Sequence, residues 1–294
     1  MNNIVEWLLS MESMSGAFYE AAVKAFQGDD DLTRFLGHLA EDEKWHHHII
    51  GTAAQYLQEE AEPVAAFSLD PETLSKIECP FHEGGRKIAT GTFTKDALIE
   101  CIVLTEFSEW NDIFQYVINY LKESRREFEP VAAKMQQHKR YIEKYLATLP
   151  DSSALLNRLR NLQPVWRERI LIAEDFPPIS EFLTALLTTK GTVDTAFDGK
   201  QGLAKISERY YDAIISDIDM PIMNGIEFYR RAVQIEPNVG GRFLFLVSNS
   251  ETEQKDFLNH NGIQYLIKPV TIKEIAMAVE GILLKSSETV VSNG

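Results

Sequence analysis

Three carboxylates, a hydroxyl and an amine end short apolar runs in the second half of the sequence: Glu174, Asp175, Asp217, Ser248 and Lys268. The carboxyl ends of parallel strands meet at one edge of a sheet, so we expect these side chains to converge. Clustered carboxylates repel one another unless a hard cation such as Mg²⁺ neutralises them. A carboxylate can attack phosphorus to give an aspartyl phosphate, while lysine and hydroxyl groups hold the phosphoryl oxygens. The set therefore predicts phosphoryl transfer to a carboxylate with Mg²⁺ as cofactor.

The runs that end in these residues are short and rich in strand-forming side chains. Stretches with helical spacing separate them along the chain. Alternation of strand and helix predicts a parallel sheet with helices on both faces. We therefore expect an α/β, flavodoxin-like (βα)5 domain with a parallel five-stranded sheet. The predicted strands cover 170–175, 192–197, 212–217, 243–248 and 265–268.

Four strings in this half resemble the response-regulator receiver family: ILIAEDF, DAIISDIDMPIMNG, LVSNS and YLIKPV. The resemblance covers roughly residues 168–286, and its most specific part is an Asp that ends an apolar strand before xxMPxxxG. It implies that Asp217 is the phosphorylated residue and that Asp175 binds Mg²⁺ directly. Glu174 is then the acidic neighbour, at a position where Asp is usual. The main-chain carbonyl of Asp219 completes the implied protein ligands.

The same resemblance implies that Ser248 and Lys268 contact the phosphoryl group and that Tyr265 is the aromatic switch residue. It also implies a cis peptide bond between Lys268 and Pro269, which X–Pro bonds allow. Asn249 departs from the family, in which a small residue is usual here, and it would narrow access to the phosphate. Two alternatives stay open: a flavodoxin-like domain with acidic loop ends, and a receiver that has lost phosphorylation.

The first half of the sequence has apolar residues at alternating spacings of three and four in four long stretches. These stretches, about 3–27, 30–60, 95–121 and 125–148, predict the core stripes of an all-α four-helix bundle. A buried Glu costs on the order of several kcal/mol unless it is paired or coordinated. We therefore expect a cation in this core, and carboxylate with imidazole suits iron or manganese and also admits zinc. Ionisable residues interrupt the stripes near their middles: Glu12, Glu43, His46, Glu106, Glu109 and His138.

Four strings resemble the rubrerythrin branch of the ferritin-like superfamily: MESMSGAFYEAA, LAEDEKWHHHI, TEFSEW and MQQHKRYIEKY. This resemblance spans most of residues 1–148 and implies that the six ionisable residues are ligands of a metal centre. Met135 stands where the family has a Glu that bridges two irons, so we expect an incomplete dinuclear site. Residues 61–94 would then be a crossover along the length of the bundle.

A metal-free bundle is the alternative, in which these Glu and His residues pair with one another. His47 and His48 lie off the apolar stripe, and we expect both in solvent. Cys79 and His82 have no second pair of ligands to form a zinc site with them. Cys79 and Cys101 are the two cysteines of the sequence, so we expect no disulfide framework.

Composition and charge set the remaining bounds. The 294 residues carry 29 Lys and Arg against 44 Asp and Glu, a net charge of −15, so we expect no direct nucleic-acid binding. No apolar run is long enough to span a bilayer, and the first residues lack the basic segment of a signal peptide. These features predict a cytoplasmic protein with no membrane segment.

Two domains follow from the change of pattern along the chain. We expect a ferritin-like bundle over 1–149, a linker helix over 150–168, a receiver over 169–286 and a tail over 287–294. Asp151 or Ser152 would cap the linker helix.

The expected function is two-component signal transduction rather than catalysis. A sensor histidine kinase or a phosphotransfer protein would phosphorylate Asp217, and the bundle would be sensor or output for iron, oxygen or peroxide. Two alternatives stay open for the bundle: an oxidase or peroxidase gated by phosphorylation, and a metal-free module for docking or for forming a homodimer.

Overall fold

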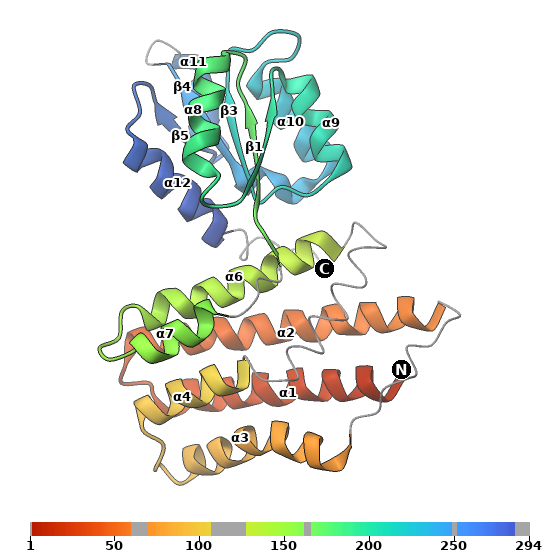
Figure 1. Ribbon diagram of the computed structural model, residues 1–294, viewed down its shortest axis with the longest axis vertical. Coiled ribbons are helices and arrows are strands. Elements are labelled where there is room, and N and C mark those ends of the chain that lie inside the picture. Colours follow the sequence, from red (N-terminus) through yellow and green to blue (C-terminus); the bar gives the residue numbers. More distant parts are fainter. Residues whose placement is uncertain (1, 60–69, 107–127, 162–165, 249–251, 286–294) are drawn as a thin grey trace. The chain divides into compact units, whose positions relative to one another are not determined.

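The computed structural model describes residues 2–59, 70–106, 128–161, 166–248 and 252–285 (Figure 1). The chain divides into two compact units. The helical unit comprises Met1–Ser124 and Tyr141–Gln163, and the sheet unit comprises Arg125–Arg140 and Pro164–Gly294. The division falls inside one continuous helix, α6, which begins in the sheet unit and ends in the helical unit.

The helical unit is built from long helices, as the periodicity predicts. Leu8, Leu36 and Leu39 of the predicted stripes have no exposed surface, and Ile77 and Phe81 of α3 are buried as well. Helix α1 packs along α2 and also against α3, and α3 packs against α4 (Figure 1). The helices of this unit are α1 (Asn2–Ala25), α2 (Asp30–Glu59), α3 (Pro71–Ala89), α4 (Lys95–Glu106), the last turns of α6 (Glu129–Leu146) and α7 (Ser153–Arg160).

Helix α3 occupies most of the stretch that we expected to be a crossover. Asp70 caps it, because one carboxylate oxygen accepts hydrogen bonds of 3.0 Å from both Glu72 N and Thr73 N. Gly84 lets the ring of Phe18 approach closely, since a Cβ at this position would lie 2.6 Å from Phe18 Cε2. Residues Pro71–Ala89 therefore form a packed helix that lies on α1.

The predicted linker helix exists as α7, and Ser152, one of the two expected caps, occupies its N-cap position. Ser152 makes no capping hydrogen bond to the start of α7. Its hydroxyl instead donates to the carbonyls of Leu146 (2.6 Å) and Leu149 (3.1 Å) in the preceding turn. Asp151 adopts a positive φ of 58° and so forms part of the turn between α6 and α7.

The sheet unit confirms the five predicted parallel strands. Their order is β2-β1-β3-β4-β5, and every neighbouring pair is parallel. The strands are β1 (Arg169–Ala173), β2 (Thr192–Ala196), β3 (Ala213–Asp217), β4 (Phe243–Val247) and β5 (Gln264–Ile267).

Helices cover both faces of this sheet (Figure 1). Alternate residues of β1 enter different cores: Ile170 and Ile172 on one face, Leu171 and Ala173 on the other. The first face is covered by α8 (Pro177–Leu187) and α12 (Ile272–Lys285). The second is covered by α9 (Gly199–Glu208), α10 (Gly225–Ile235) and α11 (Thr252–His260). Among the described residues, no helix is both long and apolar enough to cross a membrane.

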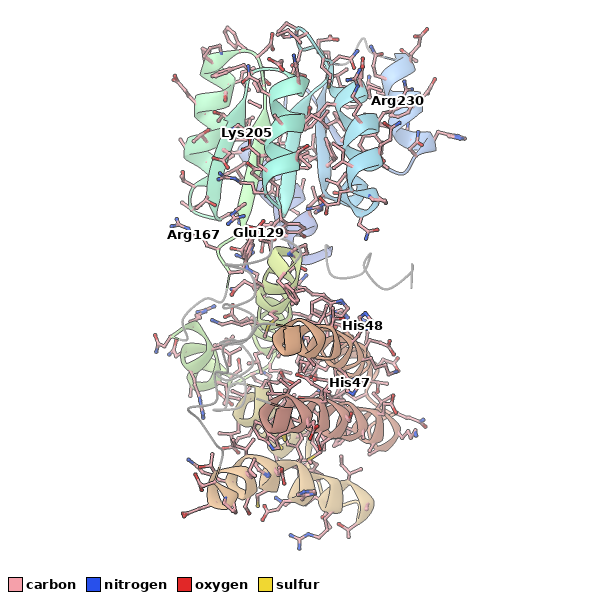
Figure 2. The ribbon with its side chains drawn as sticks, turned by 90° about the vertical axis from the view of Figure 1, so that its right-hand side faces the viewer. His47, His48, Glu129, Arg167, Lys205 and Arg230 are labelled. Carbon is pink, nitrogen blue, oxygen red and sulfur yellow. The ribbon has the colours of Figure 1, made fainter. Side chains whose placement is uncertain are left out.

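The first turn of α6 is fastened to the amino-terminal edge of the sheet. One carboxylate oxygen of Glu129 lies 2.6 Å from Arg169 Nη1, and the other accepts a hydrogen bond of 3.0 Å from Tyr210 N. Figure 2 labels Glu129 at the start of this helix. At the far end of the same stretch, Arg140 forms an ion pair of 2.7 Å with Glu168. The first half of α6 is therefore an integral part of the sheet unit.

Asp212 is buried at this edge and gives the fold a testable pH dependence. Its carboxylate accepts hydrogen bonds from Trp166 Nε1 (2.9 Å) and Arg169 N (2.8 Å). Burial nevertheless raises the pKa of Asp212 from 3.8 to about 6. The unfolded chain then loses this proton before the folded protein does. Stability therefore falls as pH rises from about 4 to about 6, by roughly 3 kcal/mol.

We expect Asp212→Asn to remove this fall, because the amide oxygen can accept the same two hydrogen bonds without a charge. Urea unfolding at a series of pH values between about 4 and 7 measures the slope. The exposed Asp256→Asn is the matched control and should leave the slope unchanged. An identical pH slope in Asp212→Asn and the wild type would show that Asp212 is not its source.

Candidate functional site

The carboxyl end of β1 supplies two of the predicted acidic residues. Glu174 is buried, and its side chain accepts a hydrogen bond of 3.2 Å from Phe176 N, two residues later. Its own main-chain N–H donates to Ala196 O at 3.0 Å, which holds it at the end of the sheet. Asp175 follows directly and is exposed. The chain thus leaves β1 with one carboxylate facing inward and one facing solvent.

Asp217 ends the neighbouring strand β3 and lies beside Lys268. Its Oδ1 atom accepts a hydrogen bond of 2.9 Å from Ile218 N and lies 2.9 Å from Lys268 Nζ. The same ammonium lies 3.9 Å from a carboxylate oxygen of Glu174. One oxygen each of Glu174, Asp175 and Asp217 lies within 4.8 Å of the others. The structure therefore brings together three predicted carboxylates and the predicted lysine.

The charges of this cluster are unbalanced. Burial raises the pKa of Glu174, the nearby Asp217 carboxylate raises it further, and Lys268 opposes both effects. One ammonium cannot neutralise three carboxylates at this spacing. Oxygen ligands from a few acidic side chains are the donor set that Mg²⁺ prefers, so these residues fit that ion.

Ser248 and Tyr265 lie on the next two strands. Asp217 pairs with Leu246 across β3 and β4, so Ser248, which follows β4, extends past it at the same edge. Ser248 is half-buried, and so is Tyr265, which packs against the core on the α9–α11 face. The peptide bond between Lys268 and Pro269 is cis, as expected.

Asp219 is exposed in the loop after β3. Asn249, the departure from the receiver pattern, lies outside the described residues.

The loop from β3 to α10 is held close beneath Asp217. Gly225 N donates to Ile218 O at 2.8 Å, which closes the loop. Ile222 adopts a positive φ of 65° at its tip. A Cβ on Gly225 would lie 2.2 Å from the carbonyl oxygen of Asp217 and 3.0 Å from Phe245 Cε1. Glycine is thus required at position 225, the last residue of the xxMPxxxG motif, because it lies against the end of β3.

We expect Gly225→Ala to destabilise the protein by about 1–3 kcal/mol, because the added methyl group must push the strand end and the loop apart. It should also slow any reaction at Asp217, whose backbone it displaces. Gly281→Ala in α12 is the matched control, since nothing lies within 4 Å of its Cβ position. That change should stabilise the helix by about 0.5–1 kcal/mol. Equal unfolding curves for the two variants would contradict the steric argument.

Comparison with known proteins identifies the C-terminal part of the chain. The family model of the response regulator receiver domain matches residues 170–280. The C-terminal domain is a response regulator receiver domain. Response regulator ArlR from Staphylococcus aureus is 33% identical over 122 residues, which are 41% of this chain and 54% of that protein. The chain thus spans about half the length of the curated relatives it matches.

Solved receiver structures also align with the receiver domain. A response regulator receiver domain protein from Clostridium thermocellum is 26% identical, with a TM-score of 0.37, over 40% of this chain and 94% of that one. The receiver domain of a sensor histidine kinase from Pseudomonas aeruginosa PAO1, solved with a magnesium ion in its active site cleft, is 23% identical, with a TM-score of 0.36. It covers 40% of this chain and 98% of that one. The family match begins at residue 170, so it does not include α1, α2, α3, α4, α6 or α7.

A second cluster of predicted ligands lies in the core of the helical unit. Glu12 on α1 and Glu43 with His46 on α2 are all buried, each less than 5% exposed. His46 Nδ1 lies 3.4 Å from a carboxylate oxygen of Glu12 and 3.6 Å from one of Glu43. Ligand atoms of the three residues lie within 4.8 Å of one another. The Glu-x-x-His spacing on α2 therefore directs both side chains at one point.

Glu106 on α4 is buried near the same carboxylates, and its partner was missed in the sequence. Tyr19 on α1 is fully buried and donates a hydrogen bond to a carboxylate oxygen of Glu106. Burial raises the pKa of Tyr19 well above its ordinary value, and the carboxylates of Glu106 and Glu43 raise it further. The available signal was that Tyr19 shares a helix face with Glu12, and a buried phenol needs a hydrogen-bond partner.

Met135, His138 and Glu109 are the remaining predicted residues of this centre. His138 and Met135 are buried on α6, in the stretch that belongs to the sheet unit. His138 stays a proposed ligand. Glu109 lies outside the described residues. His47 and His48 are exposed on α2, as expected (Figure 2).

Proposed function

We propose that the chain is a response regulator whose receiver domain is phosphorylated on Asp217 by a histidine kinase or a phosphotransfer protein. The observation that carries this proposal is the meeting of three carboxylates and one ammonium at the carboxyl edge of the sheet. Asp175, Asp217, Glu174 and the main-chain carbonyl of Asp219 would hold Mg²⁺. When bound, that ion neutralises charge on the incoming phosphoryl group.

The residues of the chain have distinct parts in this reaction. Oδ1 of Asp217 already accepts from Ile218 N and faces Lys268, so Oδ2 is the oxygen that we propose attacks phosphorus. The new bond joins Oδ2 to phosphorus, and the bond from phosphorus to the donor breaks. Lys268 then turns from the carboxylate to a phosphoryl oxygen. The Ser248 hydroxyl donates a hydrogen bond to another phosphoryl oxygen. Tyr265 is the proposed switch residue.

Acetyl phosphate provides the test, because it needs no knowledge of the partner kinase. Intact-mass spectrometry should show one phosphoryl adduct per chain in the presence of Mg²⁺. The adduct should be absent with EDTA and should be removed by hydroxylamine, as expected of an acyl phosphate. A stable adduct that forms in EDTA, or that resists hydroxylamine, would show that a different group is modified.

We further propose that the helical unit is a ferritin-like bundle that binds iron, manganese or zinc through Glu12, Glu43, His46 and Glu106, with Glu109 and His138. Support comes from the buried Glu12–Glu43–His46 cluster. Glu43 is 1% exposed, and neither of its carboxylate oxygens accepts a hydrogen bond within the described residues. Two or three carboxylates at this depth repel one another unless a cation or protons neutralise them. Met135, in place of a bridging Glu, would leave a dinuclear site incomplete.

This domain would then sense or transmit a signal about iron, oxygen or peroxide. Metal analysis of protein purified without chelators tests the metal proposal, and turnover of peroxide by metal-loaded protein would favour an enzyme instead. Protein that holds no metal and whose melting temperature ignores added Fe²⁺, Mn²⁺ or Zn²⁺ would favour a docking or dimerisation bundle.

A further inference from the structure

A surface hollow between α1 and α2 is lined in part by the buried residues Glu12 and Glu43 of the helical unit. Its volume is about 340 Å³, which corresponds to on the order of ten water molecules at ~30 Å³ each. Glu12 and Glu43 form its inner wall, while Glu20, Lys44 and His47 lie at its outer rim. Two acidic residues that are each only 1% exposed therefore line a hollow that opens to solvent.

The inner wall carries a group that points to a ligand. Neither carboxylate oxygen of Glu43 accepts a hydrogen bond within the described residues, and His46 Nδ1 lies 3.6 Å from one of these oxygens. A buried carboxylate in this state attracts a cation that can reach it. The hollow has room for such a cation with part of its hydration shell.

Gly16 keeps the hollow open. It lies in the middle of α1, where glycine is unfavourable for a helix relative to alanine. A Cβ at this position would lie 3.4 Å from Glu43 Cβ, and Gly16 lines the hollow, so a larger side chain would occupy part of the hollow beside Glu43. The glycine therefore does not serve the stability of α1, and its effect is to leave space in the hollow.

The rim carries a charge arrangement that can regulate passage. Lys44 Nζ bridges the two helices, at 3.2 Å from Glu20 on α1 and 2.8 Å from Glu41 on α2. The side chains of Lys44 and Glu20 are about half exposed, so the pair can open without unfolding either helix. A cation approaching the hollow is attracted by Glu20 and repelled by Lys44.

We propose that this hollow is the opening through which a divalent cation reaches Glu12 and Glu43, with the Glu20–Lys44 pair setting the rate of passage. The inference rests on the proposed metal site of the helical unit. It predicts that residues of the rim control how fast the metal binds, while the buried ligands control how much binds.

Stopped-flow loading of the full chain with Co²⁺, followed by its visible absorption, separates rate from stoichiometry. Gly16→Val should slow loading by about tenfold or more. Glu20→Gln should slow it about threefold, and Lys44→Met should accelerate it about threefold, with both effects shrinking at high salt. Final stoichiometry should stay at the wild-type value. The exposed Glu6→Gln and Lys24→Met on α1 are the charge-matched controls and should load at the wild-type rate.

The outcomes distinguish this proposal from the one it rests on. If wild-type protein takes up no Co²⁺, the metal site itself is refuted. If Co²⁺ binds but Gly16→Val, Glu20→Gln and Lys44→Met load like the wild type, the cation uses another route and the present inference is wrong. Should Gly16→Val misfold, the opposite rate changes in the other two variants decide alone, because general damage to the fold would slow both.

Discussion

Asp217→Asn will reduce phosphorylation by acetyl phosphate to background. The amide cannot act as the attacking oxygen anion, and removal of a covalent nucleophile typically costs at least about a thousandfold in rate. The geometry around the residue should survive, because the remaining Oδ1 can still accept from Ile218 N, which now donates at 2.9 Å. The measurement is the initial rate of adduct formation, by intact mass, at saturating Mg²⁺.

Asp219→Asn is the matched control for this experiment. It lies two residues away in the same loop and is exposed, and its proposed contribution is a main-chain carbonyl. The same loss of negative charge should therefore leave phosphorylation within a few-fold of wild type. If Asp219→Asn is as inactive as Asp217→Asn, loop charge rather than the nucleophile controls the reaction. If Asp217→Asn reacts normally, another residue accepts the phosphoryl group.

Glu43→Gln will have opposite effects with and without metal. Burial raises the pKa of Glu43 well above its ordinary value of 4.5, and the carboxylates of Glu12 and Glu106 raise it further. Without metal, the unfolded chain releases this proton above pH 4.5 while the folded protein keeps it, so stability falls as pH rises. Keeping the buried Glu43 side chain therefore costs stability at neutral pH. Glutamine removes this cost, so the metal-free variant should be more stable than the wild type.

The metal response of the same variant should disappear. Saturating metal stabilises the wild type by about 4 kcal/mol at a thousand times the dissociation constant, because only the folded state binds. Melting curves with EDTA and with Mn²⁺ give both effects, and the exposed Glu41→Gln on the same helix is the control. A Glu43→Gln protein that melts lower without metal, or that keeps the full metal shift, would contradict the assignment of Glu43 as a ligand.

The sheet and its site were largely predictable, because the local signals agree with the tertiary ones. The three inner strands are short apolar runs that are buried on both faces, as in Phe243–Val247, so their positions can be predicted without knowing their neighbours. The parallel arrangement then forces the strand ends to one edge, which explains why Asp217 and Lys268 meet at 2.9 Å. The site follows from topology once the strands are identified.

The helical unit was harder to predict beyond its apolar stripes. Helix α3 contains Pro80 and the adjacent glycines Gly84 and Gly85, which argue against a helix interior, and packing against α1 stabilises it. The Ser152 side chain could cap the following helix or donate to the preceding turn. The geometry of that turn favours the hydrogen bonds to the carbonyls of Leu146 and Leu149. The pairing of Tyr19 with Glu106 joins residues 87 positions apart, which no local pattern specifies.

The continuity of α6 limits how freely these two modules could be exchanged by recombination. A gene fragment cut at the apparent linker would encode a receiver that begins after residue 160 and lacks Glu129. The N–H of Tyr210 and the guanidinium of Arg169 would then lose the carboxylate that now accepts from both. Shuffling this receiver onto a new partner should therefore succeed only when the breakpoint lies upstream of Glu129. Although α6 ends in the helical unit, its first turns would therefore have to be transferred together with the receiver.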